Sequence, residues 1–387
     1  MKIVYFVHDL NDPAVHRRVR MLHAAGALVG LLGFCRGDPP QDVDGVAPLL
    51  LGRTKDARLL QRSVAVLRAA LALPRWRALL VDTDAIIARQ LEMLILAAIM
   101  RHIHAPGTPL IFECLDIHRL MSKPGPVGWL LRATERRMLS RCQALMVSSP
   151  EFVYAHFARW HAALPPVTLI ENKVLLFELD HPSAPAQLRL AGRPAGPPWR
   201  IGWYGMIRCA RSLRLLASLA AARPGFVEVV IRGRVATSVL PDFDRVVAAS
   251  PGLSFGGPYD RRHDLPRLYG DVHFAWAVDF YEAGGNSDWL LPNRLYEAGL
   301  FGTVPIAMGG VATGAWLARR GAGALLGDDP GQALEALFRR LDILQYSTLS
   351  HAITDLPESE FRYTAADCNN LVQGLIADSR RVAVVAD

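Results

Sequence analysis

The feature of this sequence that most constrains its fold is a steady alternation of short apolar runs with longer amphipathic stretches. Apolar runs of about four to eight residues are typical of strands buried on both faces, and the stretches between them are long enough for helices. In the first half we expect strands at Ile3–Val7, Ala27–Gly33, Leu79–Val81 with Ala85–Ile87, Leu110–Glu113, Ala144–Val147 and Val167–Ile170. Such alternation predicts an α/β fold, in which helices cover both faces of a parallel sheet.

The alternation stops at residue 181 and starts again near residue 200. The segment 181–199 has the composition of a linker, because it is rich in proline and small residues and shows no helical or strand period. We therefore predict two Rossmann-like domains, over residues 1–180 and 200–345. Residues 346–387 follow as a helical segment that packs back on the first domain. The parallel sheets of two such domains face a central cleft, which is the usual place for a ligand.

Length, hydropathy and cysteine usage narrow the class of protein. A chain of 387 residues is too long for one ordinary core. No apolar run reaches the ~18 residues of a membrane-spanning helix, and the N-terminus leads directly into a strand without a signal peptide. The five cysteines are scattered without CxxC spacing, which excludes a disulfide framework and a thiolate zinc site and fits a reducing cytoplasm.

Basic residues are concentrated in the first half of the chain. Residues 1–180 hold 22 Lys and Arg against 16 Asp and Glu, whereas the remainder holds 21 against 20. Arg53, Lys55, Arg58, Arg62 and Arg68 precede the apolar run Ala69–Leu73. A second stretch from Trp129 interleaves apolar positions with Arg132, Arg136, Arg137 and Arg141 at helical spacing. Arg and Trp at helical spacing favour an anionic membrane surface, with a solvated helix face as the alternative. No recognition motif accompanies the charge, which argues against nucleic acid.

The segment from Asp279 to Gly310 contains the pattern with the most functional information. A buried strand, Val272–Val278, leads into a loop with the pair Gly284-Gly285. Pro292 then stands at the first position of a helix, where its missing N–H costs nothing. The free backbone N–H groups at such a helix start, together with the positive end of the helix dipole, form an anion site suited to a diphosphate.

Three polar residues of this helix have the spacing to share one face. Asn293 and Glu297 are four apart, and Arg294 and Glu297 are three apart. We expect Arg294 to meet phosphate oxygens, and Glu297 to accept hydrogen bonds from two ribose hydroxyls. A surface Arg–Glu pair is the alternative interpretation.

At this point the chain resembles a known family. The stretch Pro292-Asn-Arg-Leu-Tyr-Glu297-Ala, followed by Gly302-Thr-Val-Pro-Ile306, is similar to the donor-nucleotide signature of GT-B-fold glycosyltransferases of the family-4 kind. The opening Tyr5-Phe-Val-His8-Asp9, with Arg17-Arg18-Val-Arg20, resembles their first strand and acceptor-side helix. Other stretches resemble bacterial exopolysaccharide enzymes of the succinoglycan type, namely Asp84–Arg89, Glu113–His118, Val147–Pro150, Ile170–Val174 and Ile201–Gly205. The resemblance implies a GT-B fold, with His8, Asp9 and Arg17 on the acceptor side.

The resemblance also implies residues that bind the donor in the second domain. Gly205 ends the first strand there, and Arg208 and Arg211 precede the next helix, where family members place a basic residue on the diphosphate. Arginine can bind phosphate in a bidentate way and stays charged. A solvated turn is the alternative. Gly233 follows the next strand, where it lets the backbone approach uracil or another base, or simply turns the chain.

The choice of catalytic residues depends on whether the reaction inverts or retains the anomeric configuration, and the sequence allows both. Asp116 and His118 follow the strand Leu110–Glu113, and either can serve as the base of an inverting reaction, or the two can simply tie down a loop. Retaining members of the family carry two glutamates separated by seven residues, but Trp289 stands where the first of them belongs. Glu282 or Asp288 can replace it.

The expected activity follows from these patterns together. No His, Cys or carboxylate cluster has metal-ligand spacing, so we expect a metal-independent enzyme without a cofactor. The leading hypothesis is a hexosyltransferase that moves a sugar from a nucleotide-sugar, with UDP as the expected nucleotide, to a polyprenyl-diphosphate-linked saccharide in exopolysaccharide biosynthesis. It would be peripheral on the inner face of the cytoplasmic membrane. The alternatives are a GT-B-fold sugar-nucleotide epimerase and a catalytically silent nucleotide-sugar-binding scaffold.

Overall fold

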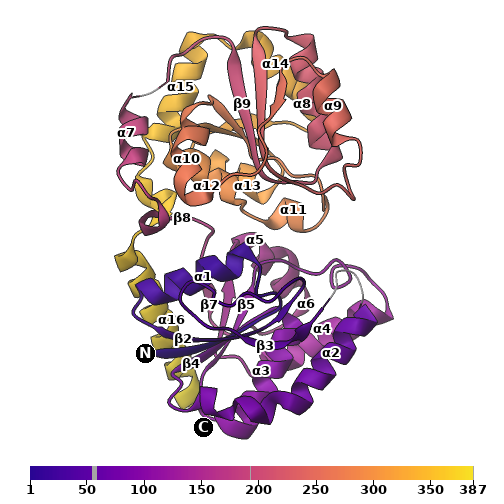
Figure 1. Ribbon diagram of the computed structural model, residues 1–387, viewed down its shortest axis with the longest axis vertical. Helices are drawn as coiled ribbons and strands as arrows, with labels where there is room; N and C mark the ends of the chain where they lie inside the picture. Colours follow the sequence, from indigo (N-terminus) through magenta and orange to yellow (C-terminus); the bar gives the residue numbers. More distant parts are fainter. Residues whose placement is uncertain (55–58, 192, 387) are drawn as a thin grey trace. The chain divides into compact units, whose positions relative to one another are not determined.

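The chain forms two compact units (Figure 1). Unit 1 comprises Met1–Glu171 with Thr364–Asp387, and unit 2 comprises Asn172–Tyr363. The computed structural model describes residues 1–54, 59–191 and 193–386, apart from the side chains of 59–64, 73–74 and 380–386.

The division between the units differs from the predicted boundaries. It lies at Glu171, ahead of residue 180, and the segment 181–199 holds helix α7 (Ala184–Ala191) in addition to extended chain. Unit 2 also continues beyond residue 345. Strand β15 (Arg362–Tyr363) pairs in parallel with β8 (Val174–Leu175), so the two ends of this unit meet. The last helix, α16 (Ala365–Ala386), packs against α1 (Pro13–Ala24) of unit 1.

Unit 1 is built on a seven-stranded sheet in the order β3-β2-β1-β4-β5-β6-β7, with parallel pairing throughout. The strands are β1 (Lys2–Val7), β2 (Leu28–Cys35), β3 (Leu49–Arg53), β4 (Ala85–Arg89), β5 (Leu110–Cys114), β6 (Ala144–Val147) and β7 (Val167–Leu169). The edge strand β3 was not predicted, because its apolar run is only Leu49–Leu51, which is partly exposed and is followed by Gly52 and Arg53. The predicted strand at Leu79–Val81 was wrong, since this stretch ends the 3-10 helix η1 (Leu73–Leu80), which has proline in its first turn.

Helices connect these strands as predicted for an α/β fold. Besides α1 and α16 they are α2 (Leu59–Ala72), α3 (Leu91–His104), α4 (Pro126–Leu139), α5 (Pro150–Phe152), the π turn η2 (Val153–Phe157) and α6 (Ala158–Trp160). The strand order reverses between β1 and β4, and in such sheets this point is where ligands bind, at the carboxyl ends of the strands.

Unit 2 repeats this design with a six-stranded parallel sheet in the order β11-β10-β9-β12-β13-β14. Its strands are β9 (Trp199–Ile207), β10 (Val227–Val235), β11 (Leu253–Phe255), β12 (Phe274–Trp276), β13 (Val304–Met308) and β14 (Ala324–Leu326). Its helices are α7, α8 (Ala210–Ala222), α9 (Phe243–Ala249), α10 (Arg261–Gly270), α11 (Asn286–Trp289), α12 (Asn293–Leu300), α13 (Ala312–Ala318), α14 (Pro330–Arg340) and α15 (Ile343–Thr354), with 3-10 turns η3 (Leu176–Glu178) and η4 (Glu358–Glu360). The order reverses between β9 and β12.

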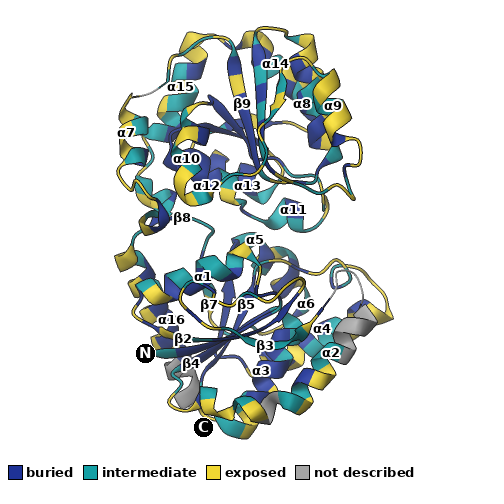
Figure 2. Ribbon diagram, viewed as in Figure 1, coloured by how far each residue is buried: buried dark blue, intermediate teal, exposed yellow. Residues whose placement is uncertain are grey.

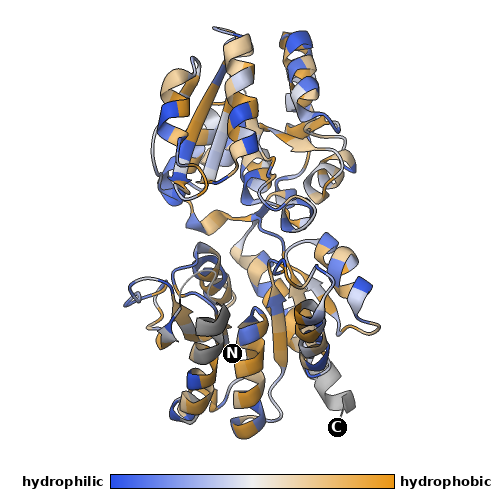
Figure 3. Ribbon diagram, turned by 90° about the vertical axis from the view of Figure 1, so that its right-hand side faces the viewer, coloured by the Kyte–Doolittle hydropathy of each residue, from blue (hydrophilic) through white to orange (hydrophobic). Residues whose placement is uncertain are grey.

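The strands form the core of each unit. Figure 2 shows the central strands as buried, and Figure 3 shows apolar stretches along them. In unit 2, Trp199, Trp203 and Trp276 are buried among aliphatic side chains of the sheet and its helices. Among the described residues, no helix has the length and apolar composition needed to cross a bilayer.

Candidate functional site

Two predicted arginines lie at the point in unit 2 where the strand order reverses. Arg208 follows β9, and its Nη2 atom lies 3.4 Å from Oδ2 of Asp279, which follows β12. The Arg208 guanidinium lies 4.6 Å from the ring centre of Tyr281. The Arg211 guanidinium lies 4.3 Å from the ring centre of Phe280. Both cations are therefore held against the loop that follows β12, at the carboxyl edge of the sheet.

The predicted glycines lie inside strands and not at strand ends. Gly205 belongs to β9 and Gly233 to β10, and the two are paired in register. Their φ angles are 104° and 136°, in a region that favours glycine. A Cβ atom on Gly233 would lie 1.8 Å from the carbonyl oxygen of Gly205, so no larger residue fits there without a shift of the backbone.

A cavity of about 370 Å³ opens beside Gly233. It lies at the carboxyl ends of β10 and β11, and its lining includes Thr237, Phe255 and Pro258. The apolar walls and the adjacent backbone of β10 match the general character of small-molecule sites.

The predicted anion site lies at the start of α12. Pro292 is the residue that precedes the helix and not its first helical residue, since its ψ is 151°. Asn293 is exposed and Arg294 is half-buried. The Nη1 atom of Arg294 is buried and has no hydrogen-bond partner within the described part of the chain. A buried guanidinium nitrogen without an acceptor is costly, so this atom is available to a bound anion.

Glu297, which the sequence leads us to expect on the ribose hydroxyls, is paired with protein groups in this structure. Its side chain is 3% exposed, with Oε1 2.7 Å from Nε of Arg261 and Oε2 2.7 Å from the hydroxyl of Tyr269. The alternative of a pair with Arg294 is not what is observed. Burial, followed by the charge of Glu297, raises the pKa of Tyr269, which stays protonated and donates. The Nη2 atom of Arg261 is also buried without a partner among the described residues.

The carboxylates proposed to replace the missing glutamate hold their own loop. Oε2 of Glu282 accepts a hydrogen bond from Nδ2 of Asn286 at 2.8 Å. Oδ2 of Asp288 accepts one from the backbone N–H of Gly284, also at 2.8 Å. These bonds fold the chain around the short helix α11, which contains Trp289.

In unit 1, His8 and Asp116 both follow strands of the parallel sheet, at its carboxyl edge. His8 follows β1, and its Nε2 atom lies 3.7 Å from Oδ2 of Asp12. Its Nδ1 atom is buried without a partner in the described residues. Burial lowers the pKa of His8; Arg89 adds to this shift, whereas Asp12 and Asp116 oppose it. A neutral imidazole with a free nitrogen can accept a proton.

Gln90 is a neighbour of this group that the sequence did not predict. It follows β4 and has a φ of 75°, which is uncommon for a residue with a side chain. Its Nε2 atom donates to Oδ1 of Asp116. His118 has a different local partner, because its Nδ1 atom accepts from the backbone N–H of Leu120 at 3.3 Å.

The other two predicted acceptor-side residues contact different parts of unit 1. Asp9 is 8% exposed and accepts hydrogen bonds from the backbone N–H groups of Asn11 and Arg36. Nη2 of Arg17 donates to the carbonyl of Glu171 at 3.4 Å. The structure therefore does not gather His8, Asp9 and Arg17 into one cluster.

A buried ionic network lies beneath this edge and was not predicted. Oε1 of Glu113 lies 2.7 Å from Nε of Arg18, and Oε2 lies 2.8 Å from Nε of Arg89 and also accepts from the hydroxyl of Tyr5. Burial alone would raise the pKa of Glu113, but Arg89 and Arg18 outweigh it and lower the pKa from 4.5 to about 2. The available sequence signal was a charged residue at the end of each of the apolar runs β4 and β5.

Comparisons with known proteins identify relatives of the whole chain. No family model matches the sequence. The succinoglycan biosynthesis protein ExoL of Rhizobium meliloti (strain 1021) is 42% identical over 381 residues, which cover 97% of this chain and 93% of that protein. Among solved structures, sucrose-phosphate synthase from Thermosynechococcus elongatus superposes with a TM-score of 0.72 at 17% identity, covering 97% of this chain and 100% of that one. Anabaena Alr3699/HepE in complex with UDP and glucose gives 0.70 at 14% identity, covering 97% and 99%. These likenesses confirm the predicted GT-B fold.

Proposed function

Because the chain belongs to the family of the succinoglycan biosynthesis protein ExoL, we propose that it is a glycosyltransferase of exopolysaccharide biosynthesis. It moves a hexose from a UDP-sugar to a lipid-linked saccharide, with the polyprenyl diphosphate of the acceptor held at the inner face of the cytoplasmic membrane. HepE is described in complex with UDP, with UDP and glucose, and with UDP-glucose, which supports this class of donor.

The observation that carries the donor assignment is the pair of unpartnered guanidinium nitrogens in unit 2. Nη2 of Arg261 and Nη1 of Arg294 are both buried without an acceptor in the described part of the chain. Phosphate oxygens supply the missing acceptors, and charged hydrogen bonds of this kind are the stronger ones. Arg208 and Arg211 add positive charge at the end of β9, and no metal ion is assigned a role.

The cavity beside Gly233 is the proposed base site. Its position at the ends of β10 and β11 allows the backbone next to Gly233 to meet the edge of a pyrimidine, while Phe255 and Pro258 provide apolar contact.

Glu297 has two possible roles toward the ribose. It either accepts directly from a ribose hydroxyl, or it only orients Arg261, to which it is bonded. Titration of wild type and Glu297→Ala with UDP and with 2′-deoxy-UDP separates the two, because alanine has no acceptor for the ribose hydroxyl. If Glu297 contacts the ribose, wild type binds 2′-deoxy-UDP more weakly than UDP, whereas the variant binds the two with equal affinity. If Glu297 only orients Arg261, the ratio of the two affinities is the same for both proteins.

We assign to His8 the role of the base that takes the proton from the acceptor hydroxyl. In an inverting displacement, the acceptor hydroxyl oxygen forms the new bond to the anomeric carbon while the bond to the UDP oxygen breaks, and the hydroxyl proton moves to the imidazole of His8. Asp12 and Asp116 then stabilise the imidazolium. NMR of the product tests this assignment, because a retained anomeric configuration contradicts it.

The membrane contact is assigned to the exposed face of α4. Trp129 is 65% and Leu130 59% exposed there, next to exposed Arg136 and Arg137. The basic surplus of the first half is not all available for this contact. Arg18, Arg89 and Arg132 are buried, and Lys55, Arg58 and the side chain of Arg62 lie outside the described residues.

The activity is tested by incubating the protein with UDP-glucose and polyprenyl-diphosphate saccharides extracted from membranes. The proposal expects release of UDP that depends on the lipid fraction. Release of UDP with free sugar in the absence of acceptor would favour the epimerase alternative. Binding of UDP-sugars without turnover, with every extracted acceptor, would favour the silent scaffold.

A further inference from the structure

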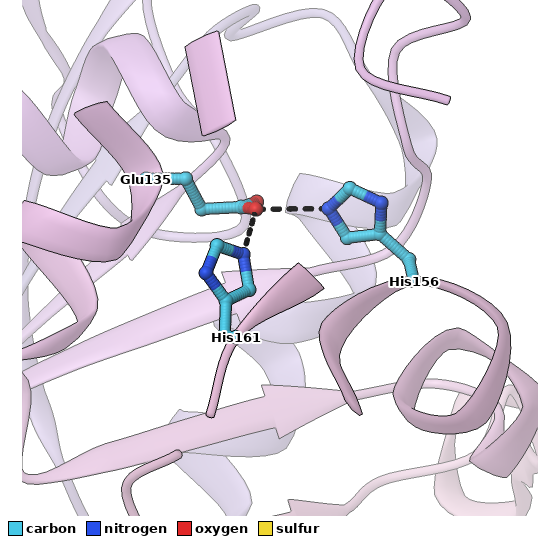
Figure 4. Close-up of side chains that lie close together, drawn as sticks. All are labelled: Glu135, His156 and His161. Carbon is cyan, nitrogen blue, oxygen red and sulfur yellow. Dashed lines mark hydrogen bonds and ion pairs between the residues drawn. The ribbon is translucent and has the colours of Figure 1, made fainter. Parts of the chain in front are cut away.

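Three buried side chains of unit 1 that have no role in the proposed function converge on one point (Figure 4). Glu135 lies on α4, His156 lies in the π turn η2, and His161 directly follows α6. Nε2 of His156 is 2.8 Å and Nε2 of His161 is 2.6 Å from the same oxygen, Oε2 of Glu135. The three residues are 0–4% exposed.

The sequence spacing conceals this cluster. Two residues five apart on an α-helix point about 140° away from each other, so His156 and His161 do not read as a ligand pair. The π turn and the end of α6 change that relation and bring both rings to Glu135. Single π turns of this kind are frequent at functional sites.

The potential ligand atoms of the cluster have their partners within it. Glu135 meets both imidazoles through a single oxygen, Oε2. Within the described residues, its ion-pair partners are these two imidazoles. Arg132, one turn earlier on α4, donates instead to the carbonyls of Met121 and Lys123. A buried carboxylate and two imidazoles that converge on one point form a donor set that a metal ion can occupy.

The donor set matches one class of metal. We propose that Glu135, His156 and His161 form a buried site for a divalent transition metal, with Zn²⁺ as the best fit. Two imidazoles and one carboxylate, with the fourth position left to a small ligand, are a known zinc set. The potential ligand atoms all lie within 4.8 Å of one another.

Metal binding requires a small rearrangement. Ligands about 2.1 Å from a tetrahedral ion are about 3.4 Å apart, so the three groups separate by roughly 0.5–0.8 Å from their hydrogen-bonded positions. Each ring then carries its proton on Nδ1. The bound ion links α4 to the turn formed by η2 and α6. It takes no part in catalysis, which the sequence predicts to be metal-independent.

The test uses the full chain purified without chelator. We expect one Zn²⁺ per chain by elemental analysis, visible d–d absorption after replacement by Co²⁺, and a melting temperature that falls with EDTA and recovers with Zn²⁺. Glu135→Gln and His161→Gln should each weaken Zn²⁺ binding at least 100-fold. His263→Gln is the matched control, because His263 also pairs with a carboxylate, that of Asp180, but is exposed.

Two results would overturn the proposal. One is wild-type protein that retains no stoichiometric metal, gives no Co²⁺ spectrum and melts at the same temperature with EDTA and with Zn²⁺. In that case the cluster is held by hydrogen bonds alone. The other is full Zn²⁺ binding in both cluster variants, which places the metal elsewhere. Neither measurement depends on glycosyl transfer, so the site can fail while the proposed function stands.

Discussion

At the scale of single residues, buried charges in this protein are neutralised by specific partners. Glu113 is fully buried between Arg18 and Arg89, and Glu297 between Arg261 and Tyr269. Replacing one member of such a group leaves an uncompensated charge in the interior, which costs more than the net value of the pair. Exposed pairs contribute much less.

The Glu113 network predicts a pH dependence of stability. Its folded pKa of about 2 lies below the ordinary 4.5, so its contribution is fully present above pH 4.5 and is lost as the pH falls toward 2. Glu113→Gln should lower the free energy of unfolding by about 3–5 kcal/mol at pH 7, measured by urea denaturation. The difference from wild type should shrink below pH 4.5. Glu335→Gln, which breaks an exposed pair with Arg339, should change stability by at most about 0.5 kcal/mol.

The unpartnered Nη1 atom of Arg294 leads us to predict how much the affinity for the donor depends on this side chain. Arg294→Ala removes a charged hydrogen bond to phosphate, and should weaken UDP-glucose binding about 10- to 150-fold in calorimetry. Arg339→Ala, an exposed arginine on α14, serves as the control and should bind as wild type does. Equal affinity of both variants would contradict the position of the diphosphate.

At the scale of elements, close backbone approach and exposed helix faces decide what each element can do. β9 and β10 come together at the Gly205–Gly233 pair, where the carbonyl oxygen of Gly205 leaves no room for a side chain on Gly233. Helix α4 buries Glu135 and Met138 on one face and exposes Trp129 and Leu130 on another. The Gly205–Gly233 pair shapes unit 2, and the exposed face of α4 is the one to which we assign the membrane contact.

Gly233→Ala tests the strand contact. Its Cβ would lie 1.8 Å from a carbonyl oxygen at a φ of 136°, so the backbone must move. Thermal unfolding should show a loss of about 1–3 kcal/mol or more. Gly374→Ala in α16 is the control, since space is open there and alanine favours helix by about 0.5–1 kcal/mol. A neutral Gly233→Ala would show that the strands adjust freely.

The exposed face of α4 predicts membrane binding. Replacing both Trp129 and Leu130 with serine should reduce binding to vesicles containing phosphatidylglycerol at least about tenfold in flotation assays, because apolar burial of about 1.5–3 kcal/mol per large side chain is lost. Leu344→Ser is the matched control, as Leu344 of α15 is 75% exposed in unit 2. Equal loss in the control would remove the assignment to α4.

At the scale of the whole molecule, one unit is a single continuous segment of the chain and the other is formed by two segments. Unit 2 is one continuous segment, Asn172–Tyr363, and contains the proposed donor residues. Unit 1 is completed by the last helix, α16, whose Val372, Leu375 and Ile376 are buried. The C-terminus is therefore part of the folding unit that begins at the N-terminus.

A chain ended at Tyr363 tests this arrangement. Losing three buried aliphatic side chains, at about 1.5–3 kcal/mol each, is large against a domain stability of about 5–15 kcal/mol. Unit 1 should become sensitive to limited proteolysis, while UDP binding by unit 2 persists. A truncated chain as protease-resistant as wild type would show that α16 is dispensable.

The sequence alone determined the two-domain parallel architecture, because apolar runs and turn residues act locally and their period is visible along the chain. It also identified the strand ends at His8, Arg208 and Asp116, since the carboxyl ends of parallel strands share one edge.

Only the tertiary structure decided which side chains meet. The partners of Glu297 come from α10, and those of Glu113 from β1, α1 and β4. The neighbours of Glu135 come from the π turn η2 and from the residue that follows α6. The protein partners of Glu297 and the separate contacts of His8, Asp9 and Arg17 could not be predicted for this reason. Pairing of buried charges depends on distances in space, which the spacing of residues along a chain does not contain.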